Sequence, residues 1–166
     1  RVYADGQRML KRLIEGRWLT ANGVIGLYPA NTVNDDDIEI YTDDSRSEVA
    51  MTWYGMRQQA EKQVIDGIMR PSRCLADFIA PRDSGLQDYI GLFAVTAGIG
   101  VEKKEKYFLD DLDDYSAITL KALADRLAEA FAECLHHRVR TDLWGYAPDE
   151  QLDNTAMIAE KYRGIR

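Results

Sequence analysis

Cysteine, proline and long apolar runs are all scarce in this chain. It has two cysteines and four prolines among 166 residues. The two thiols, Cys74 and Cys134, form no C-x-x-C pair, which speaks against a disulfide framework or a zinc site. Because both lie in apolar surroundings, we expect buried free thiols. No apolar run approaches the roughly 18 residues of a membrane span and no signal-peptide pattern opens the chain, so we expect a cytoplasmic protein without a membrane partner.

Basic residues are also in deficit. Lys and Arg number 21 against 28 Asp and Glu, which leaves a formal net charge of -7 at pH 7. Nucleic-acid binding needs a surplus of cations, because much of its affinity comes from the release of phosphate counterions. An anionic membrane surface is disfavoured for the same reason. We therefore expect no nucleic-acid partner.

The composition is nevertheless that of a folded domain. The chain is 46% hydrophobic and 30% charged. Its length suits one domain with a core that needs no disulfide bonds or metal ions for stability. It begins at Arg1, already inside a helical pattern and without an initiator Met, and stops at Arg166 just after a glycine. We interpret residues 1–166 as a single domain that is an incomplete piece of a longer protein.

Residues 22–41 contain two apolar runs around a polar, acidic segment. Residues 24–28 (VIGLY) and 38–41 (IEIY) have the β-branched and aromatic composition of strands. Pro29 and the three aspartates at 35–37 predict a connection between them that is too long for a simple hairpin turn. Loops on a rigid scaffold often carry function, but a solvated connection is the simpler interpretation.

Other segments predict a mixture of helices and strands. Apolar residues recur at three and four over residues 2–18 and 115–139, which is typical of amphipathic helices. Residues 149–162 predict a last helix. Residues 49–53 alternate and predict a strand antiparallel to the one before it. The apolar run 89–95 predicts a central strand covered on both faces.

The long predicted helix carries a row of acids. Asp125, Glu129, Glu133 and His137 stand four residues apart, so they lie along one face. Acids at this spacing suit a cation, a ligand that carries a sulfonium group, or the His or Arg of a partner. A solvated face with Arg126 nearby is the simpler interpretation. Paired acid and base catalysis lacks a third member here.

Several longer segments occur in a specific order along nearly the whole chain. They are residues 23–31 (GVIGLYPAN), 36–41 (DDIEIY), 57–62 (RQQAEK), 74–78 (CLADF), 88–91 (DYIG), 93–96 (FAVT), 121–133 (KALADRLAEAFAE), 144–148 (WGYAP) and 164–166 (GIR). Together they resemble the activation domain of cobalamin-dependent methionine synthase, the C-terminal module that binds S-adenosylmethionine.

This resemblance implies an α+β fold, with a twisted, mainly antiparallel sheet and packed helices. It implies the reactivation module of a multi-domain methyltransferase that acts on 5-methyltetrahydrofolate and homocysteine; the isolated piece is expected to be inactive. The module docks on the cobalamin-binding domain of the same polypeptide and presents S-adenosylmethionine for reductive methylation of cob(II)alamin. Flavodoxin or an equivalent reductase supplies the electron. The protein's task is then orientation and electrostatics.

The resemblance also assigns residues. Arg166 matches the arginine that opens the family's ligand motif, and its fork suits the carboxylate of the ligand's methionine part. Glu129 and Glu160 match acids near the ligand. Asp125 matches an acid that, after docking, meets the histidine released from cobalt. The family's second acid for this histidine falls at the position of Val101, which is not an acid, with Glu102 one place later, so the resemblance does not support that second contact. The rest of the ligand motif lies beyond Arg166, so we expect these 166 residues alone to bind S-adenosylmethionine weakly or not at all.

Two other functions are open from the sequence. One is a non-catalytic ligand-sensing or protein-interaction module built on the same scaffold, which a surrounding reading frame without cobalamin, folate and homocysteine modules would favour. The other is a hydrolase that uses Asp125 and Glu129. An unchanged hydrolytic rate after Glu129→Gln would exclude the hydrolase.

Overall fold

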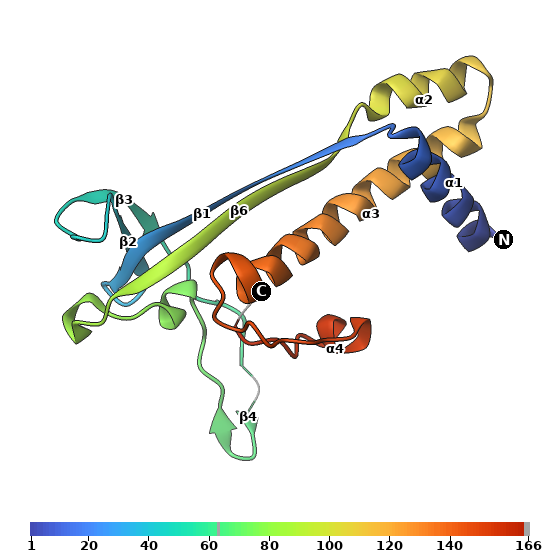
Figure 1. The fold of residues 1–166 in the computed structure, drawn as a ribbon. Coiled ribbons are helices and arrows are strands. Elements are labelled where there is room, and N and C mark those ends of the chain that lie inside the picture. The colour runs from blue at the N-terminus through green and yellow to red at the C-terminus, as the bar shows by residue number, and fades with distance from the viewer. Residues whose placement is uncertain (63, 165–166) are drawn as a thin grey trace. The chain divides into compact units, whose positions relative to one another are not determined.

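The computed structural model describes residues 1–62 and 64–164, and the chain forms two compact units. The first unit comprises Arg1–Val24 and Phe93–Arg166, and the second Ile25–Leu92. The chain contains a four-stranded sheet of order β3-β2-β1-β6 (Figure 1). Its strands are β1 (Thr20–Val33), β2 (Asp37–Tyr41), β3 (Val49–Tyr54) and β6 (Asp88–Ile99).

In the second unit, β1 and β2 form a tight antiparallel hairpin. The register pairs Ala30 with Ile40 and leaves only residues 34–36 for the turn. The prediction of a long loop between these strands is therefore wrong. Pro29 does not break β1, because it precedes the first residue that pairs with β2 and its missing N–H costs no bond to that strand. The antiparallel pairing of β2 with β3 confirms the third predicted strand.

Polar residues of β1 are buried in this unit because distant carbonyl groups accept their hydrogen bonds. Asn31 Nδ2 donates to the carbonyl oxygens of Ala80 and Leu86 at 2.9 and 3.0 Å. Thr32 Oγ1 donates to the carbonyl oxygen of Ala76 at 2.7 Å. These bonds satisfy groups that would otherwise be costly to bury, so a stretch that resembles a loop in composition lies inside the sheet.

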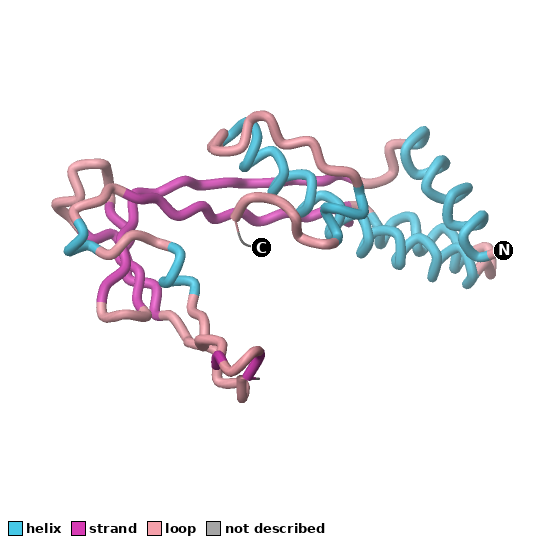
Figure 2. The backbone as a smooth tube through the Cα atoms, turned by 90° about the horizontal axis from the view of Figure 1, so that it is seen from below, coloured by secondary structure: helices cyan, strands magenta, loops and turns pink. Residues whose placement is uncertain are grey.

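The remainder of the second unit consists of short elements. A small apolar core and the hydrogen bonds of Arg57 hold them together. The elements are β4 (Val64–Ile65), β5 (Ile68–Met69), η1 (Leu75–Phe78) and η2 (Arg82–Ser84), of which β4 and β5 form a small hairpin (Figure 2). The core consists of Ala30, Ile38, Ile40, Cys74 and Ala76. Arg57 Nη2 donates to Asp36 Oδ1 at 2.6 Å and Nη1 to Asp77 Oδ2 at 2.8 Å. These bonds join the turn after β1 and the helix η1 through Arg57, and the hydrogen bond from Arg57 lowers the pKa of Asp77.

In the first unit, the long helix α3 packs against α1 and α2 (Figure 1). The elements are α1 (Val2–Gly16), α2 (Val101–Asp110), α3 (Asp114–Arg138), the π-helix η3 (Val139–Leu143) and α4 (Asn154–Ile158). Their core is Met9, Leu13, Phe108, Ala117 and Leu120. The apolar periodicity predicted α1 and α3 correctly. Asp113 Oδ1 caps α3 by accepting the Ser116 N–H at 3.0 Å.

Three further predictions differ from the structure, and one helix was missed. The strand β6 lies at the edge of the sheet, and its Leu92 and Phe93 are 48% and 41% exposed, so it is not doubly covered. The helix α2 was not predicted. The last helix spans only Asn154–Ile158 instead of residues 149–162. Cys74 is buried as expected, but Cys134 is exposed, because α3 turns that position away from its neighbours.

No helix within residues 1–62 and 64–164 is long and apolar enough to cross a membrane.

Candidate functional site

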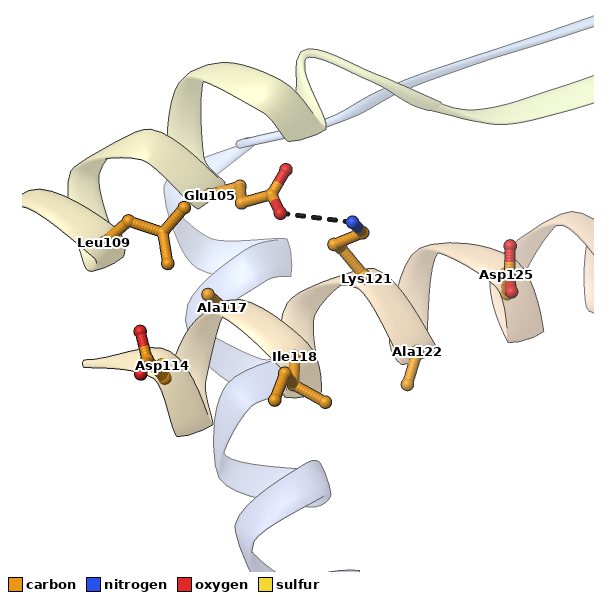
Figure 3. Close-up of a pocket in the computed structure, with 8 residues that line it drawn as sticks. All are labelled: Glu105, Leu109, Asp114, Ala117, Ile118, Lys121, Ala122 and Asp125. Atoms are coloured by element: carbon orange, nitrogen blue, oxygen red, sulfur yellow. Dashed lines mark ion pairs between the residues drawn. The ribbon is translucent and has the colours of Figure 1, made fainter. Parts of the chain in front are cut away.

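An open hollow of about 470 Å³ lies between α2 and α3 (Figure 3). Its lining residues are Glu105, Leu109, Asp114, Ala117, Ile118, Lys121, Ala122 and Asp125. Lys121 Nζ lies 3.1 Å from Glu105 Oε1, an ion pair that joins the two helices. Three carboxylates against one ammonium leave the hollow negatively charged. The predicted partner-contact residue Asp125 is thus part of an acidic surface that suits a basic group of a partner.

Glu129 lies one helical turn beyond Asp125 on α3. Its Oε2 is 2.9 Å from Arg126 Nη1, and the two side chains are 63% and 68% exposed. An exposed pair of this kind contributes little to stability. Glu129 can therefore exchange Arg126 for a charged ligand at small cost.

The rest of the acidic row differs from its first two members. Glu133 and His137 are half-buried, whereas Asp125 and Glu129 are exposed. No group of three or more His, Cys, Asp or Glu in the described part of the chain could hold a metal ion. Only the N-terminal half of the row is open to solvent as a binding surface.

The other two predicted ligand residues lie near the end of the chain. Glu160 follows α4 and has a φ of 53°, with its backbone N–H donating to the Met157 carbonyl oxygen at 3.0 Å. The structure therefore places Asp125 and Glu129 on one helix and Glu160 on a separate segment of the same unit. Arg166 lies outside the described residues.

Sequence reasoning missed the most buried charged pair of this unit. The side chains of Arg140 and Glu150 are 1% and 7% exposed. Arg140 Nη2 donates to Glu150 Oε1 at 2.6 Å, and Arg140 Nε lies 3.0 and 3.1 Å from Oε1 and Oε2. Arg140 holds the pKa of Glu150 below its usual range, because the hydrogen bonds outweigh the cost of burial.

Aromatic and imidazole rings surround this pair. Arg140 Nη1 lies 2.8 Å from His136 Nδ1; since a guanidinium can only donate, Nδ1 accepts and His136 is the neutral tautomer protonated at Nε2. The Arg140 guanidinium carbon lies 4.3 Å from the centroid of the Tyr162 ring, a cation–π distance. Phe93 stacks on His136 with centroids 6.5 Å apart. No sequence spacing signals this cluster, because its members come from β6, α3, η3 and two later segments.

Two comparisons with known proteins bear on this unit and on the whole chain. A family model described as "Vitamin B12 dependent methionine synthase, activation domain" matches residues 1–166. A solved structure described as "Crystal Structure of the MetH Reactivation Domain bound to AdoHcy" matches with a TM-score of 0.88 and 50% sequence identity. The match covers 100% of this chain and 49% of that one, so this chain spans about half the length of the structure it matches.

Proposed function

We propose, since this chain belongs to the family of activation domains of vitamin B12-dependent methionine synthase, that it binds S-adenosylmethionine for reactivation of that enzyme. The observation that carries the proposal is the 50% identity, over the whole of this chain, to a reactivation domain bound to AdoHcy. AdoHcy is what S-adenosylmethionine becomes when it gives up its methyl group. We place this function in the cytoplasm.

The partner of this chain is then a cobalamin-binding domain of the same polypeptide, with flavodoxin or an equivalent reductase as electron donor. Cobalamin, held by that domain and not by residues of this chain, would supply, once reduced by one electron, the nucleophile that takes the methyl group of S-adenosylmethionine, which would leave as S-adenosylhomocysteine. The acidic hollow with Asp125 is our proposed contact surface for the partner domain, because its excess of carboxylates suits an imidazole or guanidinium.

The residues of this chain fit a ligand with a sulfonium cation and a carboxylate. Glu129 is exposed and only weakly engaged by Arg126, so its carboxylate is available to a positive group. Glu160 lies on the exposed segment after α4. We assign Arg166 to the methionine carboxylate, where a fork of two N–H donors gives bidentate bonding. These side chains bind and orient the ligand and take no part in bond making.

Calorimetric titration with S-adenosylmethionine tests the proposal in the natural full-length protein. We expect saturable binding, with Glu129→Gln and Glu160→Gln each weakening it by about tenfold or more through loss of a charge-assisted contact. Glu15→Gln is the matched control, because Glu15 is also an exposed helical glutamate with a cationic partner, Lys11. Its affinity should stay within twofold of wild type.

Three results would contradict this proposal or change it. Absence of S-adenosylmethionine binding in the full-length protein refutes the function, and equal affinities in both glutamate variants and the control refute the residue assignment. Tight binding without methyl transfer to cobalamin in the reduced holoenzyme would favour the ligand-sensing alternative. The 166-residue piece, titrated in parallel, should bind weakly or not at all, and affinity equal to that of the full-length protein would contradict this expectation.

A further inference from the structure

The Arg140 side chain is among the largest fully buried side chains of the described chain. Burying a guanidinium is expensive unless its charge and its donors are all matched, and a buried ion pair is a weak source of stability. Here Glu150 matches the charge, and His136 accepts from the remaining terminal nitrogen at 2.8 Å. A group this costly to bury, with a partner for each of its three nitrogens, indicates that the geometry it imposes matters.

That geometry concerns residues 144–164, which we call the C-terminal segment. The segment meets Arg140 near both of its ends. Near the start, the Ala147 N–H donates to the Arg140 carbonyl oxygen at 2.8 Å, and Glu150 binds the guanidinium. Near the end, the Tyr162 ring lies against the guanidinium at 4.3 Å. One side chain therefore closes the segment into a loop whose two ends share an anchor.

Two further contacts between the segment's ends agree with this closure. The Tyr146 carbonyl oxygen accepts from Arg163 Nη1 at 3.5 Å, a long bond. Gly164 has a φ of 108°, and a Cβ there would lie 3.1 Å from Tyr146 Oη. Tyr146 therefore packs so close to position 164 that only glycine fits there without strain. The end of the segment therefore lies against its own beginning.

Arg140 lies in the π-helix η3, directly after α3. Its wider turn is shown by the Trp144 N–H, which donates to the Val139 carbonyl oxygen five residues earlier at 2.9 Å. Val139 and Arg140 are both buried at this turn, directly after the last residue of α3. Single π turns are rare in proteins, and those that occur are often found at functional sites.

We propose that Arg140 is a positioning residue for the ligand site: with Glu150 and Tyr162 it fixes the C-terminal segment, and with it Glu160, for contact with S-adenosylmethionine. The inference rests on the proposed function. Glu160 precedes the anchored Tyr162 by only two residues. Without the anchor the ligand residue is still present but its segment is not ordered. Binding must then order the segment, and the conformational entropy lost lowers the affinity.

Four variants of the full-length protein separate positioning from mere stability. Arg140→Met removes the charge and Arg140→Lys keeps the charge but loses the fork. The double variant Arg140→Met/Glu150→Leu removes both charges, which often restores the stability of a buried pair. Arg138→Met is the control, because Arg138 is an exposed arginine of the same helix end, paired with Asp142 at 2.7 Å. Each protein is compared for thermal midpoint, for amide hydrogen exchange of residues 144–164 without ligand, and for S-adenosylmethionine affinity well below its melting temperature.

We expect Arg140→Met and Arg140→Lys to raise Kd at least tenfold and to speed exchange in residues 144–164 at least tenfold, with α1 and α2 unaffected. The double variant should recover thermal midpoint but keep the raised Kd, and Arg138→Met should stay within twofold of wild type throughout. Should Arg140→Met fail to fold, Glu150→Gln, which keeps the side-chain shape, takes its place.

A Kd within twofold of wild type in Arg140→Lys or in the double variant would overturn the inference, since affinity would then follow stability alone. A wild-type protein that binds no S-adenosylmethionine refutes the proposed function and this inference with it. Binding by wild type and undiminished binding by the variants refutes the inference alone.

Discussion

Phe131 of α3 lies directly over Gly23 of β1, so closely that a Cβ on Gly23 would sit 2.9 Å from the ring carbon Cζ. The same Cβ would lie 3.6 Å from Leu135 Cδ2. An aromatic ring in a packed interface cannot move aside as the tip of a flexible chain can. The missing side chain at Gly23 is thus what lets α3 approach β1 within the first unit.

Gly23→Ala should destabilise the protein by about 1–3 kcal/mol, the usual cost of inserting a methyl group into a packed interface. Gly98→Ala on β6 is the matched control, because its Cβ would meet only Ala124 Cβ, at an ordinary 3.8 Å. Chemical denaturation of both variants measures the difference. Equal midpoints for the two would show that α3 does not pack on β1 as described.

Leu120→Ala should cost about 2–5 kcal/mol of unfolding free energy. Leu120 is 0% exposed in the core that joins α1, α2 and α3, so its truncation leaves a cavity. Ile118→Ala, two residues earlier on the same helix and 67% exposed, should change stability by no more than about 0.5 kcal/mol. Urea denaturation of the two variants checks the contrast, and a larger loss at Ile118 would contradict the orientation of α3.

The Arg140–Glu150 pair should make the first unit sensitive to acid. The folded pKa of Glu150 is lowered, so its contribution to stability is complete above the unfolded value of about 4.3 and is lost as pH falls through the folded value. In that window the unfolded state binds more protons, which gives a slope of up to about 1.4 kcal/mol per pH unit.

Thermal midpoints of wild type and Glu150→Gln between pH 3 and pH 7 test this acid sensitivity. The variant should be less stable at pH 7 and should show a shallower decline toward acid, because glutamine does not titrate. Parallel curves for the two proteins would mean that Glu150 is not held ionised by Arg140.

Local patterns predicted the elements that local physics controls. Apolar spacing located α1 and α3, and alternation together with antiparallel pairing located β2 and β3. The residues that carry the family resemblance, above all residues 121–133, predicted the fold class and the family that the comparisons confirm. Asp125 and Glu129 were predicted on one helix face, and they lie on α3, while their roles stay predictions.

Errors arose where a residue's state depends on a distant partner. Pro29 and the aspartates at 35–37 suggested a long connection, but carbonyl groups 44 to 55 residues away accept hydrogen bonds from Asn31 and Thr32 and allow their burial in β1. Cys134 was expected inside because its neighbours are apolar, yet its position on α3 faces solvent. The helix α2 is rich in charge and shows only one buried residue, Phe108, so its periodicity was too weak to detect.

Composition and periodicity by themselves determined that this is an acidic domain of mixed helices and strands, because these properties depend on neighbouring residues. The family came from the resemblance of its ordered motifs to the methionine synthase activation domain. Only the tertiary structure decided that Arg140 is buried, that Glu150 neutralises it, and that the C-terminal segment closes on this pair. The physical reason is that a charge can leave water only when partners from other parts of the chain meet it in three dimensions. The spacing of these residues along the sequence does not indicate their contacts.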